Sequence, residues 1–341
     1  MSDTTKSLRS RTGESRLIWP LAGLALLLIF NLAFDRSFFE LSAHDGNLYG
    51  PMLTVLRQAA KVMLLSIGMT LVIATGGVDL SVGSVMAICG ALVASLAENS
   101  HVSFPGQIVA SLGVAAIIGA FNGVLIAYAR IQPIIATLIM MVLGRGVALS
   151  LTGGMPLGIQ DPGVLWIGRG FIAGVPVQIL LVAAVFAVTA VVCRKTAIGL
   201  FVEAVGDNET ASHLSGVNAR GIKLIVYIFC AMCAALAALV TIGDVGRVEP
   251  DRLGQLLELD AITAVVVGGT VLTGGRFSLA GSIIGALLIQ TLTMTLIRQG
   301  MPSDVAPVPK ALVILMVCLL QSPKLRAQLG GLFSKPGRAG V

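Results

Sequence analysis

Apolar residues fall in long, nearly uninterrupted blocks along this chain, and short polar or glycine-rich stretches separate them. A helix needs roughly 20 apolar residues to cross a bilayer, and most blocks reach that length. Blocks 82–97 and 260–273 fall short and indicate broken or half helices. The blocks are 17–34, 52–74, 82–97, 104–129, 133–152, 176–193, 222–243, 260–273, 278–297 and 305–321. The pattern predicts an all-α, polytopic membrane helix bundle with about eight to ten transmembrane helices.

Composition and charge agree with this fold class. Apolar residues make up 56% of the chain and charged residues 12%, against about 25% charged in an average soluble domain. No soluble domain fits between the blocks, so we expect one transmembrane domain, 17–321, between cytoplasmic tails 1–16 and 322–341. Most of the 23 Lys and Arg residues then lie on one side, which predicts that both termini are cytoplasmic. The net charge of +6 indicates topology rather than nucleic-acid binding.

Three local features need separate interpretation. Block 17–34 follows four basic residues like a signal peptide, but no small-x-small cleavage site follows it, so it predicts a retained first span. Arg57 and Lys61 lie at the outer start of block 52–74, so segment 52–61 is either inserted or interfacial. For the cysteines, a role as small packing residues is favoured over a redox or metal pair. The histidines are isolated and provide no metal site. These residues are Cys89, Cys193, Cys230, Cys233 and Cys318, and His44, His101 and His213.

Segment 194–223 is the longest polar interruption that looks folded. Asp207 or Asn208 can cap a short helix, and Gly216 can end it two turns later. Gly199 and Gly206 are expected to divide the preceding residues into a further short turn. A transporter driven by a separate motor needs a rigid element of this kind, whereas a pore or single-chain carrier does not.

Two polar groups interrupt the first half of the bundle. Asp79 and Ser81 follow a glycine pair between blocks 52–74 and 82–97, where they can cap a half-helix at a transport pathway or a plain cytoplasmic turn. Asn122 within block 104–129 can bond a facing helix or a polar solute. Arg145 within block 133–152 requires a carboxylate, carbonyl groups or water, either as pathway lining or as a structural partner.

A third polar group opens the short block 260–273. Glu258 and Asp260 are acids at an expected helix N-terminus, where negative charge is favourable. Gly281 and Gly285 permit close helix approach. The chain lacks a Gly-x-x-x-x-Gly-Lys-Ser/Thr loop, so it cannot bind ATP by that mechanism. It also lacks the cluster of ionisable residues that a membrane enzyme or a proton relay would need.

Together these motifs resemble, over nearly the whole chain, the permease subunits of bacterial ABC importers for monosaccharides. Within that family the chain is most similar to the galactofuranose type. One departure is Gly206-Asp207-Asn208, where many relatives have Gly-Gly-Asn, which leaves the capping residue open. The motifs are 68–84, 121–123, 132–138, 145–146, 206–217, 258–270 and 273–276.

The resemblance implies a non-catalytic subunit of the bacterial inner membrane that binds no cofactor. Its partners would be an ATPase subunit that uses ATP, a second permease, identical or paralogous, a periplasmic sugar-binding protein and the lipid bilayer. An ion-coupled carrier is the alternative. The expected ATPase-coupling residues are Gly199, Glu203, Ala204, Gly206, Asn208, Ala211, Leu214, Ser215 and Gly216. The expected pathway residues for the monosaccharide are Asp79, Ser81, Asn122, Gln132, Thr137, Asp260, Thr263 and Thr270.

Overall fold

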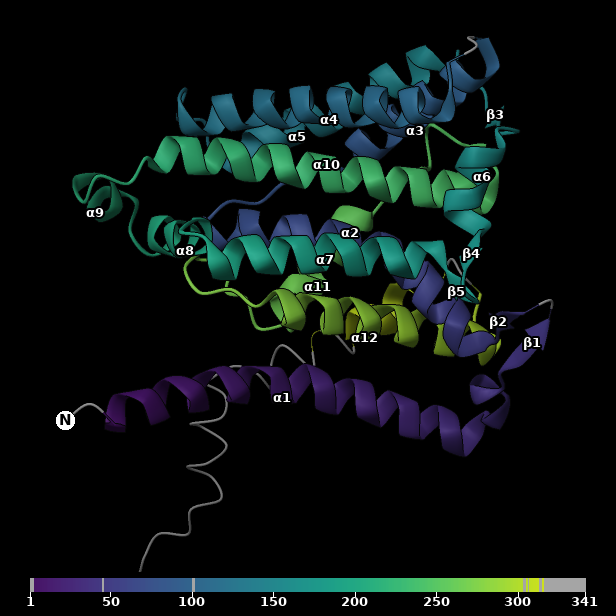
Figure 1. Ribbon diagram of the computed structural model, residues 1–341, viewed down its shortest axis with the longest axis horizontal. Helices are drawn as coiled ribbons and strands as arrows, with labels where there is room; N and C mark the ends of the chain where they lie inside the picture. Colours follow the sequence, from purple (N-terminus) through teal and green to yellow (C-terminus); the bar gives the residue numbers. More distant parts are fainter. Residues whose placement is uncertain are drawn as a thin grey trace, which may run out of the picture.

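The computed structural model describes residues 3–44, 46–99, 102–302, 305, 307–312 and 315. Its long helices run side by side, with the short helices α8 and α9 at one end and α6 with the small strands at the other (Figure 1). The long helices are α1 (Asp3–Phe34), α2 (Pro51–Ala74), α3 (Val82–Asn99), α4 (Phe104–Ala127), α5 (Pro133–Leu151), α7 (Val177–Lys195), α10 (Ala219–Val245) and α12 (Leu279–Arg298).

Shorter elements connect these helices. Each of the three small sheets is an antiparallel pair: β1 with β2, β3 with β6, and β4 with β5. The short helices are η1 (Arg36–Phe39), α6 (Pro162–Arg169), α8 (Ile198–Asp207), α9 (Glu209–Leu214) and α11 (Leu257–Val267). The strands are β1 (Ser42–His44), β2 (Asn47–Tyr49), β3 (Leu157–Gly158), β4 (Phe171–Ile172), β5 (Val175–Pro176) and β6 (Arg247–Val248).

The polytopic helical fold is confirmed, with corrections at its broken parts. Within the described residues, seven helices are long and apolar enough to cross a membrane, and α3 is a shorter apolar helix. The expected span 260–273 is wrong in extent, because α11 ends at Val267 and a glycine-rich loop follows. It is a half-helix. Helix α1 begins at Asp3 and so continues through the expected tail 1–16. Most of block 305–321, and all of the tail 322–341, lie outside the described residues.

Helices α2 and α10 form the centre of the bundle, and small residues bring them together. Gly68 of α2 faces the backbone of Cys230 and the side chain of Cys233 on α10, so a larger residue would not fit there. Both cysteines are buried and unbridged. The expected packing role of this pair is confirmed.

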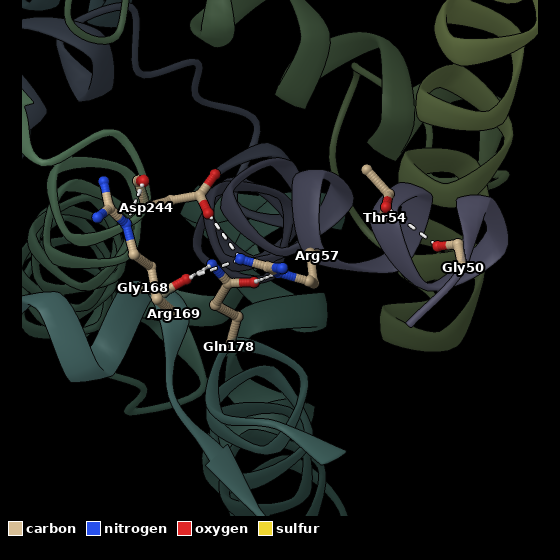
Figure 2. A network of polar contacts seen from close by, with 7 residues as sticks. All are labelled: Gly50, Thr54, Arg57, Gly168, Arg169, Gln178 and Asp244. Atoms are coloured by element: carbon tan, nitrogen blue, oxygen red, sulfur yellow. Dashed lines mark hydrogen bonds and ion pairs between the residues drawn. The ribbon is translucent and has the colours of Figure 1, made fainter. Parts of the chain in front are cut away.

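Helix α2 carries Arg57 and Lys61 in its first half, and whether segment 52–61 is inserted or interfacial stays a prediction. The helix is continuous from Pro51 to Ala74. Figure 2 shows the Arg57 guanidinium at the centre of a polar network near the α6 end of the bundle. Arg57 pairs with Asp244 of α10 at 2.9 Å and donates to Gln178 of α7 at 3.2 Å. It also donates to the Gly168 carbonyl of α6. The charge of Arg57 is thus matched by partners on three other helices, in a partly exposed network.

Helix α1 is attached to α12 by a few polar contacts. The Asn31 amide donates to Thr295 at 2.8 Å, and Arg298 pairs with Asp35 at 2.6 Å. The hydrogen bond from Arg298 lowers the pKa of Asp35 to about 2, from its ordinary 3.8. Only 11% of the apolar window of α1 is buried, against 78% for α2. Helix α1 therefore lies at the margin of the bundle.

The lowered pKa of Asp35 gives a pH dependence with a definite sign. A carboxyl group with a depressed pKa stabilises the fold above its unfolded pKa and loses that contribution as the pH falls through the folded pKa. Asp35→Asn should therefore lower the unfolding temperature in detergent by the same amount at pH 7 and pH 5, and by less at pH 3. Ser42→Ala, in the nearby hairpin, serves as the control. A difference between variant and wild type that grows on acidification would contradict the assignment.

The two ends of the bundle can be assigned to sides of the membrane by reporter fusion. Gly254, in the segment before α11, is buried against Gly83, so it is unsuitable for a fusion. Gly46 and Gly216 lie at opposite ends, and a Cβ at either would meet nothing within 4 Å. We expect a reporter at Gly216 to be cytoplasmic and one at Gly46 periplasmic. The reverse result from both would overturn the orientation expected from the basic residues.

Candidate translocation and coupling sites

The break between α2 and α3 is built by a glycine and an acid. Gly76 adopts φ +78, a left-handed conformation that ends α2 without steric cost. The Asp79 carboxylate then accepts hydrogen bonds from the Ser81 backbone N–H at 2.9 Å and the Ser81 hydroxyl at 2.6 Å. Val82 begins α3 directly afterwards. The two expected capping residues thus act together at the start of one helix.

Four of the expected pathway residues meet at this break, and we call Asp79, Ser81, Asn122 and Thr137 the break cluster. The Asn122 amide of α4 donates to the Ser81 hydroxyl at 2.9 Å, and Thr137 of α5 donates to the Val78 carbonyl at 3.4 Å. All four side chains are buried. Asn122 therefore joins α4 to the start of α3, which is the first of its two expected roles, a bond to a facing helix.

The break cluster is not fully satisfied. The Asn122 side-chain oxygen is buried and accepts no hydrogen bond. The second Asp79 oxygen is likewise buried and accepts no hydrogen bond. Buried acceptors without donors are costly, so an arrangement that supplies a donor would be favoured. The cluster is a place where a second conformation could gain hydrogen bonds.

Gln132 lies apart from the break cluster. It is exposed and precedes Pro133, which begins α5 as the sequence predicts. It borders a cavity of about 960 Å³ between the α4–α5 loop and the start of α10, with α9 as a further wall. Arg130, Arg220 and Lys223 also line this cavity and give it a basic character.

A re-entrant segment leads into the half-helix α11. Arg145 of α5 donates to the carbonyl groups of Pro250 at 3.0 Å and Leu253 at 2.6 Å, so the carbonyl partners expected for it are confirmed. Gly254 and Gly83 are so close that a Cβ on either would overlap the other's backbone. Leu256, with φ 62, turns the chain into α11.

Glu258 is a residue that sequence reasoning left out of the candidate site. It is buried in the first turn of α11, and one carboxylate oxygen accepts no hydrogen bond. That oxygen faces Gly83 of α3, and Arg145 attracts the carboxylate electrostatically. A buried acid beside a broken helix is a signal that could have included it.

The remaining pathway candidates form local bonds of their own. Asp260 pairs with Lys310 at 2.5 Å, and Thr263 donates to the Leu259 carbonyl one turn earlier in α11. The Thr270 hydroxyl accepts from the Ser278 N–H at 3.2 Å, across the loop that follows α11. The eight residues thus lie in three places: the break cluster, the cavity wall and α11 with its loop. Their contact with a solute stays a prediction.

We call residues 194–223 the coupling segment. It is folded, as expected, but two of its glycines have a different role from the expected one. Asn208 rather than Asp207 caps α9, because its side chain accepts from the Ala211 N–H at 2.9 Å. Gly216, with φ 84, follows the end of α9 as predicted. The expected glycine-bounded turn is wrong: Gly199 and Gly206 both lie within the ten-residue helix α8. They serve close packing, since a Cβ on Gly199 would overlap the Cys193 carbonyl.

Apolar side chains project from the coupling segment. Leu214 is 84% exposed and Leu200 is 66% exposed, while Ala211 is exposed between the cap and the end of α9. Glu203 and Ala204 are partly buried, and Ser215 donates to the Ala211 carbonyl at 2.9 Å. Lys223 pairs with Glu209 at 2.6 Å and ties α9 to α10. The segment is a fixed element with an uncovered apolar surface.

Comparison with known proteins identifies the class of this chain. Residues 52–320 match the family described as the branched-chain amino acid transport system / permease component, so the chain belongs to that family. It is a transport permease component and a multi-pass protein of the inner membrane. No solved structure matches the chain.

Individual relatives are named for sugars rather than amino acids. The chain is 40% identical to the galactofuranose transporter permease protein of Escherichia coli (strain K12), over 95% of this chain and 96% of that protein. It is 39% identical to the fructose import permease protein of Bifidobacterium longum, over 92% and 89% of the two chains. The ribose import permease protein of Escherichia coli (strain K12) is 37% identical, over 89% and 93%.

Proposed function

We propose that this chain is the membrane permease subunit of an ABC importer for a monosaccharide. The observation that carries the proposal is the coupling segment, a rigid helical pair with exposed apolar side chains outside the long helices. Full-length similarity to relatives named for galactofuranose, fructose and ribose supports sugar as the substrate class.

The α8–α9 end would face the cytoplasm and receive the ATPase subunits. Basic residues gather at this end, as the positive-inside rule requires. A periplasmic sugar-binding protein would deliver the solute at the α6 end, and a second permease, identical or paralogous, would complete the pathway. ATP would bind to the partner subunits only. The basic residues at this end are Lys6, Arg9, Arg11 and Arg16 in the first part of α1, and Arg130, Arg194, Lys195, Arg220, Lys223 and Arg276.

A neutral sugar needs hydrogen-bonding groups rather than a fixed charge along its pathway. The break cluster and α11 carry such groups at helix interruptions, which in transporters surround the solute site. We propose that Asn122, whose side-chain oxygen lacks a donor, and Glu258 contact the solute in a second conformation, or contact the residues that close its pathway. Gln132, Asp260, Thr263 and Thr270 remain candidates for the same pathway.

Reconstitution tests the function directly. The permease, its ATPase and its binding protein are placed in liposomes, and uptake of radiolabelled galactofuranose, ribose and fructose is measured. We expect uptake of a sugar only with ATP inside and binding protein outside. Uptake driven by an ion gradient without the ATPase would establish the alternative, a secondary carrier.

Enlarging an exposed residue of α9 tests the coupling surface. Ala211→Trp should leave the subunit folded, because Ala211 is exposed. We expect the bulky ring to hold the ATPase away, so that co-purification or sugar-stimulated ATP hydrolysis falls by about tenfold, the effect of 1.4 kcal/mol. Ala211→Ser is the control of small size. Wild-type values for the Trp variant in both measurements would remove α9 from the ATPase interface.

A further inference from the structure

Three segments that are distant in sequence meet through their backbones near the α8–α9 end. A Cβ on Gly206 of α8 would overlap both the Ala74 carbonyl at the end of α2 and the Gly275 N–H in the loop after α11. The Gly275 N–H donates to the Ala74 carbonyl at 2.8 Å. A Cβ on Gly274 would lie 2.8 Å from the Gly206 oxygen and 2.9 Å from the Gly76 nitrogen. We call Gly76, Gly206, Gly274 and Gly275 the glycine junction.

The glycine junction corrects the reason for which Gly206 was expected at a coupling surface. Gly206 is among the expected ATPase-coupling residues, where a glycine would let another protein approach closely. The space beside it is instead filled by this chain. Because the contact is backbone to backbone, no flexible side chain stands between Gly206 and the end of α2 at this point. Close-packed contacts transmit displacement. Movement of α8 must therefore move the end of α2 and the loop 268–277, or break the junction.

Beyond the junction, α11 is contacted by its neighbours at glycines as well. Gly281 and Gly285 of α12 lie against the carbonyl groups of Gly268 and Ala264. Gly254, before α11, lies against Gly83 of α3. Helix α11 has only eleven residues and is followed directly by the loop that enters the junction.

Helix α10 is the other element that could receive the motion, since it follows α9 directly. It is 27 residues long, and 67% of its apolar window is buried, packed against α2, α4 and α6. Gly119 and Gly123 of α4 fit against its backbone, and Gly168 of α6 fits against Gly243. Shifting α10 would disturb most of the bundle, whereas shifting α11 disturbs one half-helix.

We propose that the glycine junction carries the movement of α8 into the loop after α11, so that α11 is the element the motor displaces during transport. Gly206 and Gly275 are positioning residues for this step. The inference rests on the proposed function and extends it, because it names the route by which ATP hydrolysis reaches the pathway.

Gly206→Ala tests the route with a single methyl group. Alanine favours a helix more than glycine does, so α8 itself should be stabilised and only the junction disturbed. We expect membrane insertion and ATPase association to be retained, while the sugar imported per ATP hydrolysed falls by about tenfold, the upper range for positions that carry coupling. Gly146→Ala is the control, because a Cβ there meets nothing within 4 Å. A ratio within about twofold of that control, or loss of ATPase association instead, would overturn the proposal.

A labelling experiment decides the question if Gly206→Ala fails to insert. Leu272, in the loop after α11, is 48% exposed and can be changed to cysteine. Cys193 and Cys318 are first replaced by serine; Cys89, Cys230 and Cys233 are buried. In the assembled importer we expect the thiol at position 272 to react at different rates without nucleotide and with a non-hydrolysable ATP analogue. Ile225→Cys on α10, 53% exposed, should react at one rate in both states.

The two proposals fail in different ways. If the unaltered importer takes up no sugar with ATP, the proposed function is wrong and the junction has no motor to serve. If uptake depends on ATP but the thiol at position 272 reacts at one rate throughout, only the junction proposal is wrong. A nucleotide-dependent rate at position 225 with a constant rate at 272 would place the motion in α10 instead.

Discussion

Arg57→Ala is expected to lower the free energy of unfolding by about 2 kcal/mol. The change removes one donor from the network in Figure 2 and leaves the Asp244 carboxylate without its ion pair at 2.9 Å. Breaking a fully buried ion pair costs about 3–5 kcal/mol. The Asp244 side chain is 40% exposed, so water recovers part of that cost. Thermal unfolding in detergent measures the loss.

Neighbouring variants separate the ion pair from general disturbance of the α6 end of the bundle. Arg169 donates only to the Asp244 backbone carbonyl and is exposed, so Arg169→Ala should cost less than about 1 kcal/mol. The double change Arg57→Met with Asp244→Leu should recover much of the stability, because no unpaired charge remains. Equal losses for Arg57→Ala and Arg169→Ala would show that the Arg57–Asp244 ion pair adds nothing to stability.

Asp79→Leu is expected to reduce sugar uptake by at least about tenfold while the protein still inserts. Leucine leaves the Ser81 N–H and hydroxyl without their acceptor inside the bundle, at a cost of about 1–3 kcal/mol. The start of α3 and the hydrogen bond from Asn122 then lose their fixed positions. Asp79→Asn should retain partial uptake, because an amide oxygen can still accept both hydrogen bonds.

Uptake in liposomes and the amount of protein in the membrane are measured together for each variant. Thr241→Val is the matched control: Thr241 donates only to the Ala237 carbonyl of its own helix, so its removal leaves no donor unpaired. Full uptake by the Leu variant would remove Asp79 from the pathway. Equal loss for the Asn and Leu variants would show that the carboxylate charge is required.

Sequence predicted the elements whose causes are local. Long apolar blocks gave the spanning helices, and Pro133 marked the start of α5. The capping residue Asn208 marked the start of α9, and Gly216 marked its end to within about one residue. Each of these signals acts within a few residues, so no knowledge of the packed bundle is needed to read it.

The errors arose where the cause lies on a distant segment. The partners of Arg57 could not be named because Asp244 and Gln178 follow more than a hundred residues later. Gly206 looked like an opening for a partner because the backbone that fills it belongs to α2 and to the loop after α11. Glu258 was left out because the Gly83 that lies against it is far away in sequence.

The marginal position of α1 has a consequence for biogenesis. The family match begins at residue 52, after α1, and the described contacts of α1 with α12 centre on Gly23, Asn31 and Asp35. Such a helix can enter the bilayer alone, ahead of the region that matches the family, and dock when α12 emerges from the ribosome. A hybrid whose first span comes from an unrelated single-pass protein, with those three residues grafted onto it, should still assemble.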